Sequence, residues 1–216
     1  MKNYLSGKVV IITGGTAGFG LASAELLLEQ GAKVVITGRN PERLQAAEKQ
    51  LAHDSLLAVR ADAVSTADWK ETIRQTLDRF GRIDVLVNNH GAGVKIADVE
   101  QMSDEDIRTV IEINLTSVIK GCREVIPVMK RQGCGQIINV SSGCAYHSWP
   151  KWAIYTAAKE GMVGFTRCLH LEMSEWGGKA KAASAKADEM RAAGAVADAD
   201  KFDNLARVAL KKQIDF

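Results

Sequence analysis

The sequence predicts an α/β fold, a doubly wound parallel sheet with helices on both faces, and three observations lead to that class. Short apolar runs alternate with helical patterns along most of the chain. A glycine-rich turn joins the first apolar run to the first helix. The length of 216 residues, with 46% hydrophobic and 25% charged residues, suits one domain built around one sizeable core.

Five apolar runs have the length of strands and the unbroken hydrophobic character of strands that are covered on both faces. They span residues 8–13, 33–37, 56–60, 84–87 and 136–140. No run of this kind follows Val140. These five runs are therefore expected to form the sheet.

Helical patterns fill the connections between the runs. From about Thr66 to Phe80, apolar residues recur at the spacing of one helix face. Ser103 and Asp106 have the spacing of a capping box, which would open a long helix that reaches at least Cys122. Strands that alternate with helices imply parallel pairing and right-handed crossovers.

The turn after the first run reads TGGTAGFG over residues 13–20 and leads into a helix. Glycines allow a tight turn and let backbone N–H groups approach a pyrophosphate, and the helix N-terminus adds favourable partial charge. A glycine-rich string alone is weak evidence. The strand before it and the helix after it make a dinucleotide-binding turn the better interpretation.

The end of the second predicted strand favours NADP(H) over NAD(H). In dinucleotide folds an acidic residue at this place binds the ribose 2′-OH of NAD, whereas a nearby arginine accommodates the 2′-phosphate of NADP. Here Gly38 stands where the acid would be, and Arg39 follows it. A guanidinium matches a phosphate well. NAD(H) remains the alternative, because the glycine turn holds no second basic residue.

Tyr155 and Lys159 form the most specific pattern, YxxxK, on one face of a predicted helix. A free phenol has a pKa of about 10. A nearby ammonium group is expected to lower it, so that the tyrosine can act as a general acid or base. Ser142 precedes Tyr155 by 13 residues, just past the last predicted strand, and could donate a hydrogen bond to a substrate oxygen.

In order and spacing, these motifs resemble the short-chain dehydrogenase/reductase family over about residues 7–175. The resemblance implies a Rossmann fold and a hydride transfer between NADP(H) and a carbonyl or secondary alcohol, with Tyr155 as general acid or base. The implied catalytic residues are Asn114, Ser142, Tyr155 and Lys159. The implied cofactor-binding residues are Gly14, Thr16, Gly18, Phe19, Gly20, Arg39, Asp62, Ala63, Asn88, Gly91, Tyr155 and Lys159.

Individual roles also follow from the resemblance. Asp62 and Ala63 would contact the adenine ring, and Lys159 would hold the nicotinamide ribose. Asn114 would support a water relay to Lys159; an asparagine inside a helix is locally unfavourable, which itself suggests a functional reason. His90 departs from the family pattern, because it replaces the small residue of the NNAG segment, and it is expected to pack or form hydrogen bonds.

The end of the chain departs further. The family continues into a sixth strand, a Pro-Gly segment and a seventh strand, and none of these is evident here. Residues 1–178 are expected to form the cofactor-binding domain, and residues 179–216 an Ala/Lys-rich helical segment that could be a remnant of the substrate lid. Either residues are missing after Gly178 and after Phe216, or the sheet is short. A short sheet would favour the alternative function, a non-catalytic cofactor-binding or interaction protein.

Aromatic residues precede the Tyr155 helix in the segment of residues 144–152, which includes Tyr146, Trp149 and Trp152. Their rings could stack on an apolar or ring-shaped substrate, or they could simply pack beneath neighbouring segments. The sequence leaves both interpretations open.

Composition limits the partners and the location. The net charge of +2, without a basic run interleaved with aromatics, argues against nucleic acid. No apolar segment approaches the ~20 residues of a membrane span. The four cysteines form no CxxC pair and no metal-binding spacing, so reduced thiols, no metal and a cytoplasmic location are expected. By resemblance, the protein would act on a small-molecule substrate as a homodimer or homotetramer.

Overall fold

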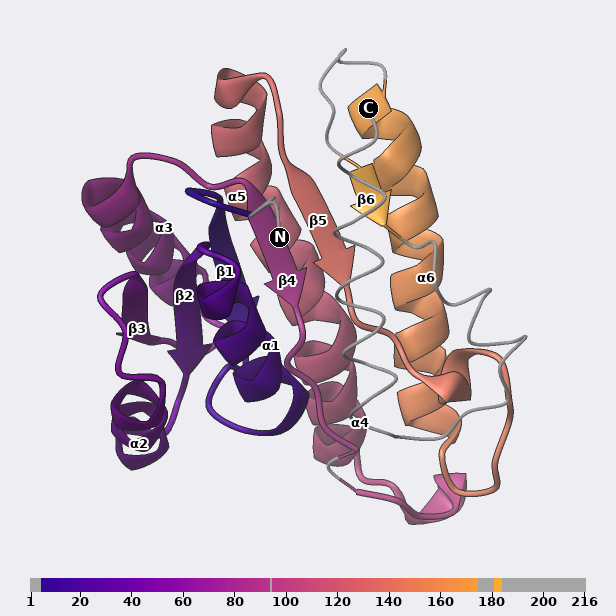
Figure 1. The fold of residues 1–216 in the computed structure, drawn as a ribbon. Helices are drawn as coiled ribbons and strands as arrows, with labels where there is room; N and C mark the ends of the chain where they lie inside the picture. Colours follow the sequence, from indigo (N-terminus) through magenta and orange to yellow (C-terminus); the bar gives the residue numbers. More distant parts are fainter. Residues whose placement is uncertain (1–4, 94, 175–180, 184–216) are drawn as a thin grey trace.

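The computed structural model describes residues 5–93, 95–174 and 181–183, and within them six parallel strands form one sheet (Figure 1). The strand order is β3-β2-β1-β4-β5-β6. The strands are β1 (Val9–Thr13), β2 (Lys33–Gly38), β3 (Leu56–Arg60), β4 (Val85–Asn88), β5 (Gln136–Asn139) and β6 (Lys181–Ala183). The predicted α/β class and the first five strands are confirmed, with ends that shift by one residue.

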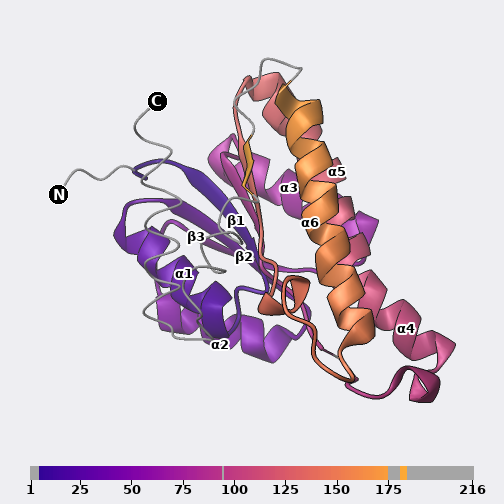
Figure 2. The same ribbon diagram turned by 90° about the vertical axis from the view of Figure 1, so that its right-hand side faces the viewer.

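Helices cover both faces of the sheet (Figure 2). One face packs on α1 (Gly18–Glu29) and α2 (Pro41–Leu51), and the other on α3 (Thr66–Phe80), α5 (Ser117–Gln132) and α6 (Ala153–Ser174). Side chains alternate between the two cores along β1: Ile11 faces the α3, α5 and α6 side, whereas Val10 and Ile12 face the α1 and α2 side. This is why the strands read as continuous apolar runs.

The chain reverses direction across the sheet between β1 and β4. From β1 it continues outward to β2 and β3, and then returns to place β4 on the opposite side of β1. In open parallel sheets, ligands bind beyond the carboxyl ends of the strands at such a reversal. A ligand-binding site is therefore expected at the segments that follow β1, β4 and β5.

The predicted long helix from Ser103 is present but changes its winding. The capping box forms as expected: Ser103 and Asp106 each accept the other's backbone N–H. Between α4 (Asp104–Ile111) and α5 lies a π-helical turn, η2 (Glu112–Thr116), with Asn114 at its centre. Such turns occur mostly at functional sites.

The expectation that no strand follows Val140 is corrected by β6, which pairs in parallel with β5. Its sequence, Lys-Ala-Ala, lacks the β-branched and aromatic residues typical of strands, so the sequence pattern did not predict a strand here. Apart from these three residues, the predicted C-terminal helical segment and the question of a seventh strand lie outside the described residues. Within the described part of the chain, none of the helices has the length and apolar character needed to span a bilayer.

Candidate active site

The glycine turn after β1 is tight enough to require its glycines. A Cβ on Gly20 would lie 2.3 Å from the carbonyl oxygen of Gly14, and Gly14 itself has a φ of +68°. Gly18 has a φ of +53°, and nothing lies within 4 Å of the position where its Cβ would be. The turn is therefore closely packed on its inner side and open at the N-terminus of α1, as an approaching phosphate requires.

Asn89, at the end of β4, holds this turn in place. Its Nδ2 donates to the carbonyl oxygens of Thr13 at 3.0 Å and Gly14 at 3.3 Å. Its backbone N–H donates to the hydroxyl of Thr13. The sequence predicts no role for Asn89, because a contact between residues 76 positions apart leaves no local signal.

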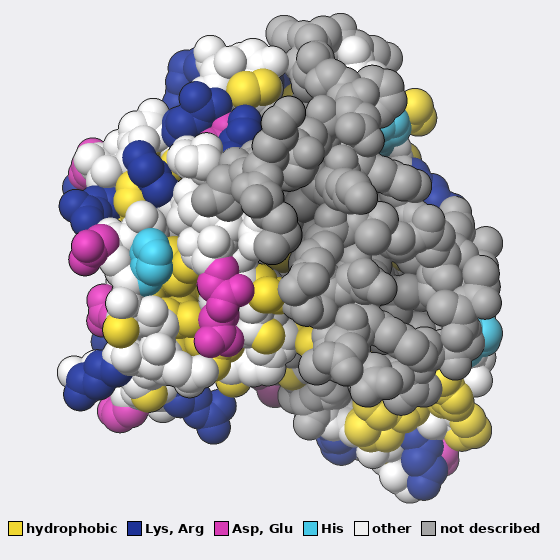
Figure 3. All heavy atoms as spheres, viewed as in Figure 1, with side chains coloured by type: hydrophobic (Ala, Val, Ile, Leu, Met, Phe, Trp, Pro, Cys, Tyr) yellow, Lys and Arg dark blue, Asp and Glu magenta, His cyan; other side chains and the backbone are white. Residues whose placement is uncertain are grey.

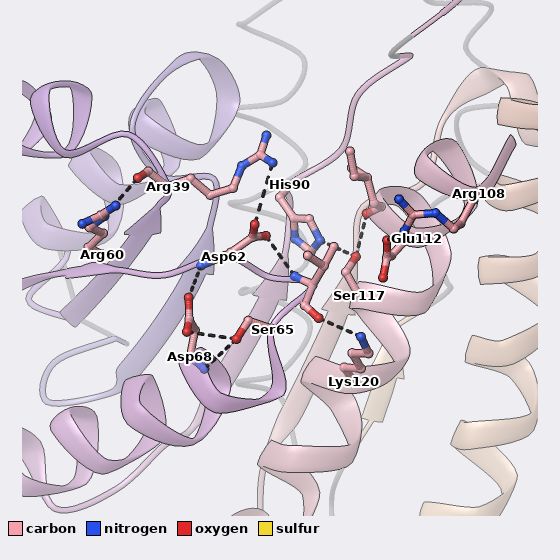
Figure 4. A network of polar contacts seen from close by, with 12 residues as sticks. Arg39, Arg60, Asp62, Ser65, Asp68, His90, Arg108, Glu112, Ser117 and Lys120 are labelled. Carbon is pink, nitrogen blue, oxygen red and sulfur yellow. Dashed lines mark hydrogen bonds and ion pairs between the residues drawn. The ribbon is translucent and has the colours of Figure 1, made fainter. Parts of the chain in front are cut away.

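The end of β2 lies beside the turn. A Cβ on Gly38 would lie 2.5 Å from Cγ2 of Thr16, so a side chain at this place would require Thr16 to move. Arg39 is two-thirds exposed and its Nη1 lies 3.9 Å from the Asp62 carboxylate (Figure 4). Arg60, at the end of β3, directs its Nε to the carbonyl oxygen of Arg39 at 3.4 Å. The Arg39 guanidinium therefore extends toward Asp62, whereas Arg60 contacts the backbone of Arg39.

Asp62 organises the segment after β3. Its carboxylate accepts from the backbone N–H of Val64, and its own N–H donates to Asp68. The carbonyl oxygen of Ala63 accepts from the indole N–H of Trp69 at 2.8 Å. The segment is thus fixed by α3, and the half-buried Asp62 side chain remains turned toward Arg39 (Figure 4).

Ser142, Tyr155 and Lys159 come together beyond the end of β5. The Ser142 hydroxyl lies close enough to the hydroxyl of Tyr155 to lower the pKa of the phenol. The Ser142 Oγ also accepts the N–H of Cys144 at 3.2 Å, which fixes its orientation. The buried Lys159 Nζ lies 5.7 Å from the centre of the Tyr155 ring and donates to the carbonyl oxygen of Val140 at 3.1 Å.

Asn114 reaches the same place from the π-helical turn. Its side chain pairs twice with the backbone of Ala92: Nδ2 donates to the carbonyl oxygen at 2.7 Å, and Oδ1 accepts the N–H at 3.1 Å. Between Asn114 and Lys159 lies Gly91, whose Cβ would be 2.9 Å from Asn114 Oδ1 and 3.2 Å from Lys159 Nζ. The structure therefore brings all four predicted catalytic residues to one place.

Burial controls the ionisation of this group. Desolvation lowers the pKa of Lys159 to about 8. Desolvation also raises the pKa of Tyr155, against a smaller lowering by the hydrogen bond from Ser142. The expected lowering by Lys159 is thus not observed here, because the ammonium lies over the ring and not at the phenol oxygen.

Comparison with known proteins identifies the family. The family model described as "short chain dehydrogenase" matches residues 8–189. The chain belongs to the short-chain dehydrogenase/reductase family. It is therefore an oxidoreductase by family, and its sheet is the Rossmann sheet that the sequence predicts.

The names of three relatives of this chain differ in the activity that they give. "Dehydrogenase/reductase SDR family member 4" of Caenorhabditis elegans is 37% identical, over 78% of this chain and 66% of the relative. The "3-oxoacyl-[acyl-carrier-protein] reductase FabG" of Chlamydia pneumoniae is 38% identical, over 81% and 71%. The "NADP-dependent (R)-specific alcohol dehydrogenase" of Lentilactobacillus kefiri is 40% identical, over 74% and 64%. The chain thus spans about two thirds of the length of these relatives.

A solved structure agrees with the fold. The crystal structure of a short chain dehydrogenase from Mycobacterium smegmatis has 35% sequence identity and a TM-score of 0.77. It covers 81% of this short-chain dehydrogenase, which in turn covers 75% of that chain.

The Asn88 side chain is turned into the core between β4, β5 and α5. It is fully buried, and Nδ2 donates to Asn139 Oδ1 at 2.9 Å and to the sulfur of Cys122 at 3.5 Å. The backbone carbonyl oxygen of Asn88 accepts from the N–H of Val140. These bonds tie β4 to β5 and α5, so the Asn88 side chain supports the sheet and does not face the glycine turn.

His90 takes the hydrogen-bonding role that was expected of it. Its Nδ1 lies 2.7 Å from the hydroxyl of Thr13, and its Nε2 lies 2.6 Å from the hydroxyl of Ser117 (Figure 4). Burial is the main reason that its pKa falls to about 4. The histidine therefore joins the end of β1 to the start of α5 in its neutral form.

The described residues fit a dinucleotide. The turn is open only at Gly18, where a phosphate could approach the N-terminus of α1. Arg39 would face the 2′-phosphate, and Asp62 and Ala63 would lie by the adenine. Lys159, Asn114 and Gly91 would surround the nicotinamide ribose, where the close approach of Gly91 leaves no room for a side chain.

Proposed function

We propose that this protein transfers hydride between NADP(H) and a small-molecule carbonyl or secondary alcohol, with Tyr155 as general acid or base. The observation that carries the proposal is the convergence of Ser142, Tyr155, Lys159 and Asn114 beyond the end of β5. The family supports it, because the named relatives are reductases and dehydrogenases. The convergence also favours catalysis over a purely cofactor-binding role.

In the proposed reaction the bound dinucleotide supplies or accepts the hydride, and the protein orients and polarises the substrate. The Ser142 oxygen already accepts a backbone N–H, so its own hydrogen is available for the substrate oxygen. Tyr155, whose raised pKa keeps it protonated, would give its proton to the same oxygen during reduction. Lys159 and Asn114 would hold the ribose and pass protons toward the tyrosine.

The preference for NADP(H) rests on the end of β2. Arg39 is exposed, and its guanidinium extends past the end of β2 toward Asp62, where a 2′-phosphate would lie within its reach. An acid at Gly38 would collide with Thr16, which argues against the arrangement that selects NAD(H). One relative carries NADP dependence in its name.

The proposal extends to the assembly and the location of the protein. We propose a homodimer, or a homotetramer, that uses the faces of α5 and α6, which the family commonly uses. All four cysteines are unpaired, which is consistent with the proposed cytoplasmic location. Light scattering would test the assembly, and a strict monomer at micromolar concentration would contradict it.

The experiment is steady-state turnover of the purified protein with NADPH and with NADH, each against a panel of ketones and aldehydes. The proposal expects steady oxidation of NADPH that depends on the carbonyl compound, and a kcat/KM at least about tenfold higher than with NADH. Binding of NADPH without turnover of any carbonyl compound would contradict it.

A further inference from the structure

Two connections meet beside Tyr155. One follows β4 (residues 89–98), and the other follows β5 (residues 140–152). A Cβ on Gly93 would lie 3.3 Å from the ring of Trp152 and 3.9 Å from Cδ1 of Ile96. At their outer ends, Lys151 and Asp98 form an ion pair of 3.9 Å. The two connections therefore form one continuous surface (Figure 1, lower edge).

This surface is unusually apolar. Six large hydrophobic side chains are exposed among the described residues. Two of them lie here, Trp149 at 46% and Ile96 at 49%, and a third, Val99 at 53%, directly follows the first connection. Figure 3 shows hydrophobic side chains gathered at the same lower edge of the molecule. Exposed apolar side chains that gather in one patch are typical of ligand-binding or interaction surfaces.

The rings point back to the proposed acid. Trp152 meets the ring of Tyr155 edge-on, with ring centres 5.4 Å apart and an angle of 70°. Trp149 lies beside Gly143, where an added Cβ would be 3.6 Å from the indole. Gly143 directly follows Ser142, so one tryptophan adjoins the tyrosine and the other adjoins the serine.

The charges of the two connections are already paired. Lys151 pairs with Asp98, and Lys95 donates to Asp106 at 2.6 Å. Both pairs are partly exposed and stabilise little, but each cancels the charge of a lysine that could otherwise attract an anion. Among the described residues of these connections, no lysine or arginine is left to pair with a substrate carboxylate or phosphate.

We propose that Trp149, Trp152 and Ile96 select an uncharged substrate whose carbonyl group is attached to a flat ring system, such as an aryl or fused alicyclic ketone. With its oxygen between Ser142 and Tyr155, the ring of such a ketone would lie against the edge of Trp152 and beneath Trp149. This inference rests on the proposed function, because it assumes that the carbonyl is placed by Ser142 and Tyr155.

The test compares kcat/KM for three ketones with NADPH as the cofactor. 1-Tetralone is flat and cyclic, 2-butanone is short and acyclic, and 4-oxopentanoate is anionic. The proposal expects 1-tetralone to exceed both others by about 100-fold. Trp149→Ala should lower the ratio of 1-tetralone to 2-butanone about tenfold, mainly through KM. Trp152→Leu should lower the ratio of 1-tetralone to 2-butanone by a similar factor, whereas Trp152→Phe, which keeps an aromatic ring, should leave this ratio near the wild-type value. Leu171→Ala, which changes an exposed residue on α6, is the control and should not alter the ratio.

Calorimetric binding of 1-tetralone to the Tyr155→Phe protein with NADP+ separates the two proposals. Binding that Trp149→Ala weakens about tenfold supports ring recognition even if no ketone is reduced, and then only the proposed function fails. Turnover without preference for the ring ketone, or a ratio unchanged by Trp149→Ala, overturns ring recognition and leaves the proposed function standing. Absence of both turnover and binding overturns both.

Discussion

His90 and Ser117 are joined by a hydrogen bond of 2.6 Å between the imidazole Nε2 and the serine hydroxyl. Ser117 gives its own hydrogen to the carbonyl oxygen of Ile113, also at 2.6 Å, so the imidazole must be the donor. The other ring nitrogen, Nδ1, is then an acceptor and receives the hydrogen of Thr13. A neutral histidine gives each ring nitrogen a partner in this chain of bonds, and burial disfavours its protonation.

The first prediction concerns this link. The folded-state pKa of His90, about 4, lies below the ordinary 6.5, so its stabilisation is complete above pH 6.5 and is lost as the pH falls toward 4. We expect His90→Ala to lower the free energy of unfolding by about 1–3 kcal/mol at pH 7. The variant should also lack the loss of stability between pH 6.5 and pH 4 that protonation of His90 causes. Denaturant unfolding across pH measures both, with His170→Ala on α6 as the control. Parallel pH profiles of the wild type and His90→Ala would contradict the assignment.

The second prediction concerns the cofactor preference. Arg39→Ala should raise KM for NADPH about 10- to 100-fold and leave KM for NADH nearly unchanged, because only NADPH carries the 2′-phosphate. Arg39→Lys should fall between the two, since it keeps the charge but loses the fork of donors. Steady-state kinetics with both dinucleotides measure this, and Arg74→Ala on the exposed face of α3 serves as the control. Equal effects on NADPH and NADH would show that Arg39 has no part in the preference.

The third prediction separates two neighbouring serines. Ser142→Ala should lower kcat for carbonyl reduction by about 10²-fold, because it removes a donor to the developing charge on the substrate oxygen. Ser141→Ala is the matched control: its hydroxyl donates to the backbone carbonyl oxygen of Lys159 at 3.4 Å, and it should change kcat little. If both variants lose activity equally, the loss reflects local structure and Ser142 has no distinct role.

The fourth prediction concerns the cost of burying Lys159. Its pKa of about 8 in the folded protein lies below the ordinary 10.5, so the buried charge destabilises the fold below pH 8. That penalty is relieved as the pH rises from 8 toward 10.5. Lys159→Met should therefore raise stability at pH 7 by up to about 3 kcal/mol while it abolishes turnover. The gain should shrink between pH 8 and pH 10; a destabilised variant at pH 7 would refute this account.

The first five strands were predictable because each is a continuous apolar run, a pattern that burial on both faces imposes. The capping box at Ser103 was predictable for a similar reason, since both partners lie within one helical turn. β6 was not, because Lys181–Ala183 carries little strand propensity and its pairing is set by β5. The sequence pattern therefore predicted those elements that depend on their own residues, and it missed the strand that depends on its partner.

The sequence predicted which residues form the candidate site, but it did not predict how their side chains are arranged. Asn114 stood out as an unfavourable helical residue, yet the π-helical turn that aims it at Ala92 has no sequence signal. Asn89 was overlooked because its partners lie on β1. The direction of the Tyr155 pKa was predicted wrongly, because four-residue spacing brings Lys159 to the ring face and not to the hydroxyl. Such details depend on packing between distant segments.

The most direct test of the central claim is the rate at which Tyr155→Phe oxidises NADPH with a ketone that the wild type reduces. Phenylalanine keeps the ring that packs on Trp152 and removes only the hydroxyl beside Ser142. The account predicts a fall of at least about 10²-fold in kcat, with unchanged affinity for NADPH in a parallel binding titration. A variant that binds NADPH normally and still reduces the ketone at the wild-type rate would contradict the role of Tyr155 and the mechanism built on it.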